Sequence, residues 1–172
     1  MIHIRRATIS DAWLIARLAK KSFIESHGHS ASEKDIGFYV STNLSLTAIR
    51  RDLNSQGNIY HLIYYKKQPA GFSKIILYQP HQGLAIKPVA KLERLYLLER
   101  FYGLGLGYRL FRFLVILCKQ KTQQGMWLFV WKQNERAIKF YKQSGFTIAG
   151  TGDFKISETH SNPNYLMLLS WK

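Results

Sequence analysis

The sequence predicts an α/β fold, in which one sheet carries helices on both faces. Segments of alternating apolar and polar residues predict strands, whereas apolar residues three and four apart predict helices. The two kinds of segment succeed one another along 172 residues with no linker, repeat or low-complexity stretch between them. Hydrophobic residues make up 47% of the chain, enough for a sizeable core. We therefore expect a single domain over residues 1–172.

The first half of the chain predicts a strand, three helices and a hairpin. Ile2 and Ile4 alternate with polar residues, as in a strand with one buried face. Ser10 and Asp11 are suitable helix N-caps, and Ser32 begins a Ser-x-x-Asp start of a second helix. The expected elements are a strand at 2–7, helices that begin near 12, 32 and 46, and hairpin strands at 59–65 and 71–78.

The second half predicts a strand followed by alternating helices and strands. Leu110 and Leu114 lie on one apolar face of a helix expected from about 105 to 121. Gly145 is expected to end a later helix, because glycine accepts the left-handed conformation found there. The other expected elements are a loop at 79–88, a strand ending near 97, a buried strand at 126–130, a helix at 134–144, strands at 146–151 and 165–171, and a polar loop between the last two.

The composition limits the ligands and the compartment. The chain contains 25 Lys and Arg residues and 10 Asp and Glu residues, which gives a formal net charge of +15. This excess favours a phosphorylated ligand and would also suit nucleic acid. The single Cys118 lies on an apolar helix face, as expected of a buried structural thiol in a reducing compartment. No signal peptide or bilayer-spanning run is recognisable, so we expect a cytoplasmic protein without a membrane partner.

Residues 92–108 predict a phosphate-binding bend. The segment begins as a strand and continues with Gly103, Gly105 and Gly107 where a helix is expected to begin. Without Cβ atoms in the way, successive N–H groups can face a ligand, and the helix adds the positive end of its dipole. Alternate glycines can also form a tight turn that binds nothing, so this pattern alone leaves both interpretations open.

A second motif lies downstream of the glycine bend. Residues 134–146 read Asn-x-x-Ala-x-x-Phe-Tyr-x-x-x-Gly-Phe. Together with the bend, this motif resembles the GNAT superfamily of acetyl-CoA-dependent N-acetyltransferases, and every defined position of it matches. The first GNAT motif, Gln/Arg-x-x-Gly-x-Gly/Ala, is matched at 102–107 except that Tyr102 replaces Gln or Arg. The resemblance covers most of the chain and implies the GNAT fold, with a mixed, mostly antiparallel sheet.

The resemblance also implies acetyl-CoA as the co-substrate, without a metal ion. The backbone N–H groups of the bend would hold its diphosphate, and the strand before the bend would align its pantetheine arm. The expected cofactor-binding residues are Leu95, Tyr96, Leu97, Tyr102, Gly103, Leu104, Gly105, Leu106, Gly107 and Asn134.

Two side chains and one backbone group are the candidates for catalysis. Tyr141 matches the family tyrosine that acts as a general acid on the departing thiolate; its structural alternative is a core aromatic. Glu93 falls where several GNAT enzymes place a glutamate base, and burial would raise its pKa. An ion pair with Arg94 or Lys91 is the alternative for Glu93. The backbone N–H of Leu97 matches the family's oxyanion donor.

The acceptor side is defined less sharply. In the family the first helices form the acceptor cleft, which here gives Phe23, Glu25, His27 and Tyr39 as expected substrate-binding residues. Val130-Trp131-Lys132 resembles the polyamine and diamine acetyltransferases, except that Lys132 replaces their glutamate. The net charge opposes a polycation unless an acidic cleft forms from Glu25, Asp35, Glu93 and Glu158. His27 and His29 lack a third ligand nearby, which favours loop polar residues over a metal site.

The sequence therefore predicts an acyltransferase that moves an acetyl group directly to a primary amine. The acceptor would be a polyamine, an amino acid derivative or a peptide, and the protein a monomer or homodimer. Two alternatives use the same scaffold differently. One is a basic RNA- or ribosome-binding module, although no RNA-binding motif is present. The other is an inactive coenzyme A sensor.

Overall fold

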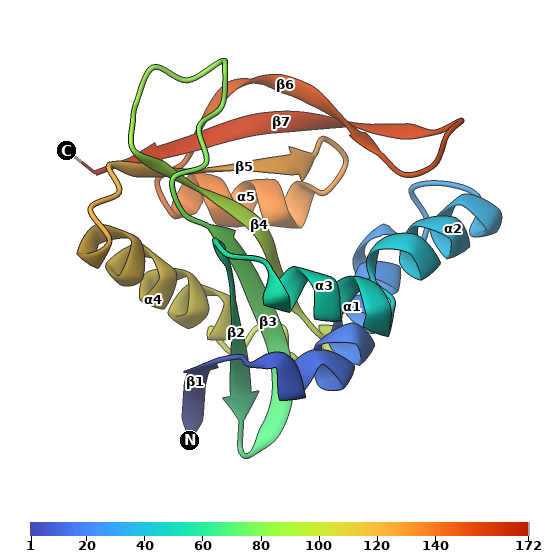
Figure 1. Ribbon diagram of the computed structural model, residues 1–172. Helices are drawn as coiled ribbons and strands as arrows, with labels where there is room; N and C mark the ends of the chain where they lie inside the picture. The colour runs from blue at the N-terminus through green and yellow to red at the C-terminus, as the bar shows by residue number, and fades with distance from the viewer. Residues whose placement is uncertain (172) are drawn as a thin grey trace.

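The computed structural model describes residues 1–171, which form seven strands and five α-helices (Figure 1). The strands are β1 (Ile2–Arg6), β2 (Asn58–Tyr65), β3 (Gln68–Ile76), β4 (Val89–Leu97), β5 (Gly125–Trp131), β6 (Thr147–Lys155) and β7 (Ser161–Ser170). The helices are α1 (Ala12–His27), α2 (Glu33–Asn43), α3 (Leu46–Asn54), α4 (Leu106–Gln120) and α5 (Glu135–Gln143), with short 3-10 turns η1 (Ile9–Asp11) and η2 (Glu99–Phe101).

All seven strands form one sheet in the order β1-β2-β3-β4-β5-β7-β6. The β4–β5 pair is parallel and the other pairs are antiparallel. One large core cluster joins α1, α2 and α3 to the β1–β3 half, and another joins α4 and α5 to the β5–β7 half. The predicted GNAT fold, a mixed and mostly antiparallel sheet with helices on both faces, is confirmed (Figure 1).

The sheet opens between its two central strands. The pairing of β4 with β5 runs only from Val89↔Gly125 to Lys91↔Trp127. Beyond this point β4 continues beside β3 up to Leu97, and β5 continues beside β7 up to Trp131. The two strands therefore diverge (Figure 1), and the inner edge of β4 beyond Lys91 has no strand partner among residues 1–171. Backbone groups on such an edge are free to pair with an extended ligand.

A bulge in β4 lies at the opening. Ile75 of β3 pairs with Leu92, whereas the next residue back, Lys74, pairs with Arg94. Glu93 is thus the extra residue of the bulge. A bulge bends its strand and changes where the neighbouring side chains point, so Glu93 and Arg94 do not follow a simple strand alternation.

The last hairpin differs from the prediction. A polar loop was expected between strands at 146–151 and 165–171, but β6 and β7 stay paired as far as Lys155↔Ser161. The segment is polar because much of the hairpin faces solvent, so apolar alternation could not reveal it. Gly152 is required here, since a Cβ would lie 2.7 Å from the Phe129 ring.

Two smaller observations concern Cys118 and the helices. Cys118 is fully buried on α4, and burial raises the pKa of its thiol to about 12, which agrees with a structural role. Within residues 1–171, no helix combines the length and the apolar character needed to cross a membrane.

Candidate active site

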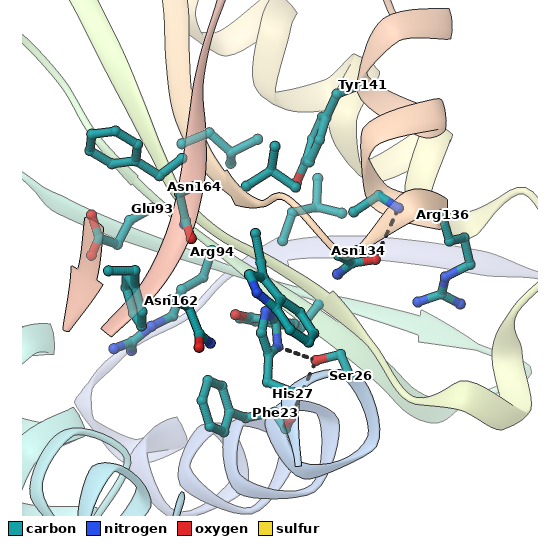
Figure 2. Close-up of a pocket in the computed structure, with 18 of the residues that line it drawn as sticks. Phe23, Ser26, His27, Glu93, Arg94, Asn134, Arg136, Tyr141, Asn162 and Asn164 are labelled. Atoms are coloured by element: carbon teal, nitrogen blue, oxygen red, sulfur yellow. Dashed lines mark hydrogen bonds between the residues drawn. The ribbon is translucent and has the colours of Figure 1, made fainter. Parts of the chain in front are cut away.

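A pocket occupies the gap between the diverging strands (Figure 2). Its walls come from α1 and α2, from β4 and β5, from the β6–β7 hairpin, and from the first turns of α5. Ten of the residues predicted for the site line it: Phe23, His27, Tyr39, Glu93, Leu95, Tyr96, Leu97, Tyr102, Asn134 and Tyr141. The fold therefore brings together most of the side chains that the two motifs and the first helices were expected to supply.

The second motif is a capped helix that presents Tyr141. Asn134 is the N-cap, and its Oδ1 accepts a hydrogen bond of 3.1 Å from the Ala137 N–H. At the other end Gly145, with φ of 96°, and Phe146 donate their N–H groups to the carbonyls of Lys142 and Tyr141. These two hydrogen bonds together form a Schellman motif. Most defined positions of the motif therefore hold the helix at a fixed length and orientation.

The Tyr141 phenol faces the pocket (Figure 2). The side chain is only 9% exposed and its ring lies 5.4 Å from that of Phe146. Burial raises the pKa of Tyr141 above its ordinary value, so the hydroxyl stays protonated at neutral pH. No hydrogen bond within residues 1–171 uses this hydroxyl, which leaves its proton available to a bound molecule.

The bend before α4 offers free backbone donors. Gly103 and Gly105 have φ of 77° and 71°, and a Cβ on either would point into open space. Backbone hydrogen bonds in the described chain leave the N–H groups of 103–108 unused, since the first helical bond joins the Arg109 N–H to Gly105. Tyr102 is different, because its N–H donates to the Glu99 carbonyl at 2.9 Å. The free donors therefore begin at Gly103, one residue later than expected.

Arg136 was not predicted from the sequence, because it occupies an undefined position of the second motif. Its guanidinium lies 3.4 Å from the centroid of the Tyr102 ring, and both residues line the pocket. Tyr102 stands where the first GNAT motif has Gln or Arg. The structure thus places a guanidinium from α5 beside the bend, where the sequence of the bend itself lacks one.

Glu93 has different electrostatics from those expected. Burial opposes its ionisation, but Lys91, Lys74 and Arg94 together outweigh this effect, so its pKa is lowered rather than raised. Lys91 Nζ lies 2.5 Å from Glu93 Oε2. This contact lies outside hydrogen-bond geometry and the buried oxygen has no other partner in residues 1–171, so the pair is mainly an ionic contact. Figure 2 shows Glu93 across the pocket from Tyr141. The expected increase in the pKa of Glu93 is wrong, because the alternative ion pair with Lys91 forms and Lys74 of the neighbouring strand adds a charge that the sequence did not place there.

The expected acceptor residues divide into two groups. Phe23, His27 and Tyr39 form a stack, with Phe23 centroids 5.0 Å from His27 and 4.5 Å from Tyr39. The Trp131 ring is tilted against that of His27, with the two centroids 5.8 Å apart. Glu25 does not line the pocket; its carboxylate accepts a 2.9 Å hydrogen bond from the Glu99 N–H and so connects α1 to η2.

The pocket is basic rather than acidic. Its one carboxylate among the described residues is Glu93, against Lys91, Arg94 and Arg136. Of the four residues considered for an acidic cleft, Glu25, Asp35 and Glu158 lie outside this lining. The charge that would attract a polycation is therefore not gathered in the pocket.

One buried histidine, His61, and one half-buried histidine, His27, make stability depend on pH. Burial, with smaller effects of His29 and Arg6, lowers the pKa of His27 and His61 from 6.5 to about 4. The unfolded chain therefore binds more protons between pH 6.5 and 4, so stability is lost as the pH falls through this window. We expect urea unfolding to show a loss of roughly 2 kcal/mol per histidine between pH 7.5 and 5.

The variant His61→Gln should reduce this pH dependence, whereas His3→Gln, at an exposed position, should not. An unfolding free energy that stays constant from pH 7.5 to 5 would contradict the neutral state of the His27 and His61 rings in the folded protein.

The fold and the pocket together define a class of protein: an α/β protein with a split sheet, a glycine bend with free backbone donors and a protonated phenol at the split. The family model described as acetyltransferase (GNAT) family matches residues 15–146. The chain belongs to the GNAT family and is an N-acetyltransferase by class.

Relatives agree with this assignment, and a solved structure agrees with the fold. An uncharacterized N-acetyltransferase of Lactobacillus delbrueckii subsp. lactis is 24% identical over 131 residues, covering 76% of this chain and 75% of the relative. Another from Mycobacterium tuberculosis is 24% identical over 160 residues, covering 93% and 97%. The PaiA N-acetyltransferase of Thermoplasma acidophilum, solved in complex with coenzyme A, has a TM-score of 0.79 at 20% identity over 99% of both chains. This last likeness concerns the fold.

Proposed function

We propose that this protein transfers the acetyl group of acetyl-CoA directly to a primary amine. The observation that carries the proposal is a bend with free N–H groups at Gly103–Gly107 that directly follows Tyr102, a residue that lines the same pocket as Tyr141. Gly103 and Gly105, which have positive φ, leave open space where a Cβ would lie. A diphosphate needs such space together with several converging N–H donors, so the bend fits coenzyme A. Arg136 supplies a positive charge beside it.

The residues of the pocket then divide the work of the reaction. The amine nitrogen forms a bond to the thioester carbon, the C–S bond breaks, and the amine loses a proton to water. Tyr141 gives its proton to the departing thiolate and recovers one from solvent. The Leu97 N–H, on the unpaired edge of β4, stabilises the charge that develops on the carbonyl oxygen. Most of the acceleration comes from holding both substrates together in the split.

An assay of acetyl-CoA consumption over a panel of amines tests this function. The panel contains spermidine, free amino acids and short peptides, and Tyr141→Phe serves as the inactive control. Turnover of no amine, together with tight coenzyme A binding, would contradict the proposal and favour an inactive coenzyme A sensor. RNA binding that falls steeply with salt would favour the basic RNA-binding module.

Glu93 remains a prediction for the general base, and the low pKa argues for a smaller role. Lys91 stabilises the ionised form of Glu93 and lowers its pKa, so this carboxylate is a weaker base. We therefore expect Glu93→Gln to leave the ascending limb of the pH–rate profile between pH 6 and about 9 in place. Disappearance of that limb in the variant would restore Glu93 as the base.

A further inference from the structure

Arg94 brings a guanidinium into the pocket at the end away from the glycine bend. It follows the bulge at Glu93 and lines the pocket together with Tyr39 and Phe23. Figure 2 shows Arg94 and Arg136 at opposite ends of the pocket, with Asn162 beside Arg94. Arg136, which stacks on Tyr102, therefore lies at the bend. Arg94 lies where the acceptor would enter.

The charge of Arg94 is not neutralised by a carboxylate of the protein. Its two acidic neighbours are already paired: Asp52 with Lys74 at 2.6 Å, and Glu93 with Lys91 at 2.5 Å. Within residues 1–171, no carboxylate oxygen lies within the 4.0 Å of an ion pair with Arg94. A guanidinium that is partly removed from water and unpaired is unfavourable.

Neighbouring tyrosines fix the orientation of Arg94. Its Nη1 donates to the Tyr60 hydroxyl at 3.3 Å, and that hydroxyl donates to Asp52 Oδ2 at 2.6 Å. A guanidinium has five N–H donors, so those on Arg94 that Tyr60 and Tyr39 do not use remain for a ligand. Planar, bidentate recognition of a carboxylate is the chemistry that suits arginine best.

We infer that the acceptor is a primary amine that also carries a carboxylate, and that Arg94 binds this carboxylate. The inference rests on the proposed function and narrows its substrate class to amino acids and similar compounds. The aromatic walls of Phe23, Tyr39 and Trp131 would surround the rest of the molecule. A polyamine would leave Arg94 unpaired and would add positive charge to a basic pocket.

Matched pairs of acceptors test the role of the carboxylate. Leucine, methionine and phenylalanine are each compared with their carboxamides, which keep the amine and the side chain but lack the negative charge. We expect kcat/KM for the acid to exceed that for the amide by about 10- to 100-fold in at least one pair. Arg94→Gln should remove the difference by slowing the acid alone, and Arg94→Lys should keep part of it.

An unfolding free energy and a coenzyme A affinity equal to those of the wild type show that Arg94→Gln is folded, and Arg17→Gln at an exposed position is the matched arginine control. Equal rates for acids and amides, or a preference for spermidine or O-phosphoethanolamine, would overturn the inference while leaving acetyl transfer established. A preference for the acid over the amide that is unchanged in Arg94→Gln would also overturn the inference.

A binding measurement separates this inference from the proposed function. N-acetylphenylalanine and its amide are titrated into the protein with coenzyme A present, so no turnover is required. Tighter binding of the acid by about tenfold or more, lost in Arg94→Gln, supports the inference even if no amine is acetylated. Equal binding of the two products contradicts it.

Discussion

Replacing Tyr141 by phenylalanine lowers kcat by roughly 10²- to 10³-fold and leaves the binding of coenzyme A nearly unchanged. The substitution removes one oxygen from a side chain that already packs as an aromatic against Phe140 and Phe146. Since no hydrogen bond in the described chain uses the hydroxyl, its loss leaves no buried partner unsatisfied. The missing proton is needed only as the thiolate departs, so the effect belongs to kcat.

Tyr65→Phe is the matched control for this result. Tyr65 packs edge-on against Phe101 and lies outside the pocket. Steady-state kinetics on both variants and the wild type, with the best amine of the panel, make the comparison. Tyr141→Phe with a wild-type kcat would show that the thiolate leaves without help from this phenol.

Replacing Gly105 by valine weakens coenzyme A binding by at least about 100-fold, which corresponds to about 2.8 kcal/mol. The new side chain has room, because nothing lies within 4 Å of its Cβ. It therefore occupies the space in front of the free N–H groups where a diphosphate would lie. Isothermal titration with coenzyme A measures the loss directly.

The left-handed backbone at Gly105 makes valine there reduce stability, and the control variant must lose stability in the same way. A valine with φ of 71° is strained by roughly 1–3 kcal/mol, which lowers stability whether or not a ligand binds. Gly57 is also exposed, has φ of 93° and has open space at its Cβ, but it lies between α3 and β2. Gly57→Val should lose comparable stability and keep coenzyme A affinity. Wild-type affinity in Gly105→Val would show that the diphosphate binds elsewhere.

The parts of the site that the sequence predicted are those fixed by local backbone geometry. The helix at 135–143 needs a cap at Asn134 and a left-handed residue at Gly145, and both requirements appear as residue types at a set spacing. The bend likewise needs residues that tolerate positive φ at 103 and 105. Such requirements act within a few residues, so a sequence motif contains them.

The parts that the sequence did not predict depend on contacts between distant segments. The low pKa of Glu93 results partly from Lys74, which comes from the neighbouring strand, and the unpaired charge of Arg94 results from Asp52 being bound to that same lysine. Arg136 gains its place beside Tyr102 only when α5 packs next to the bend. No spacing rule connects these residues, and a one-residue bulge was enough to alter the expected alternation of β4.

A crystal structure with coenzyme A tests the central claim most directly. We predict diphosphate oxygens about 3 Å from the N–H groups of Gly103–Gly107. The pantetheine should lie along the unpaired edge of β4, with its sulfur facing the Tyr141 hydroxyl. A diphosphate bound to another surface, with the N–H groups of the bend left to solvent, would contradict the account.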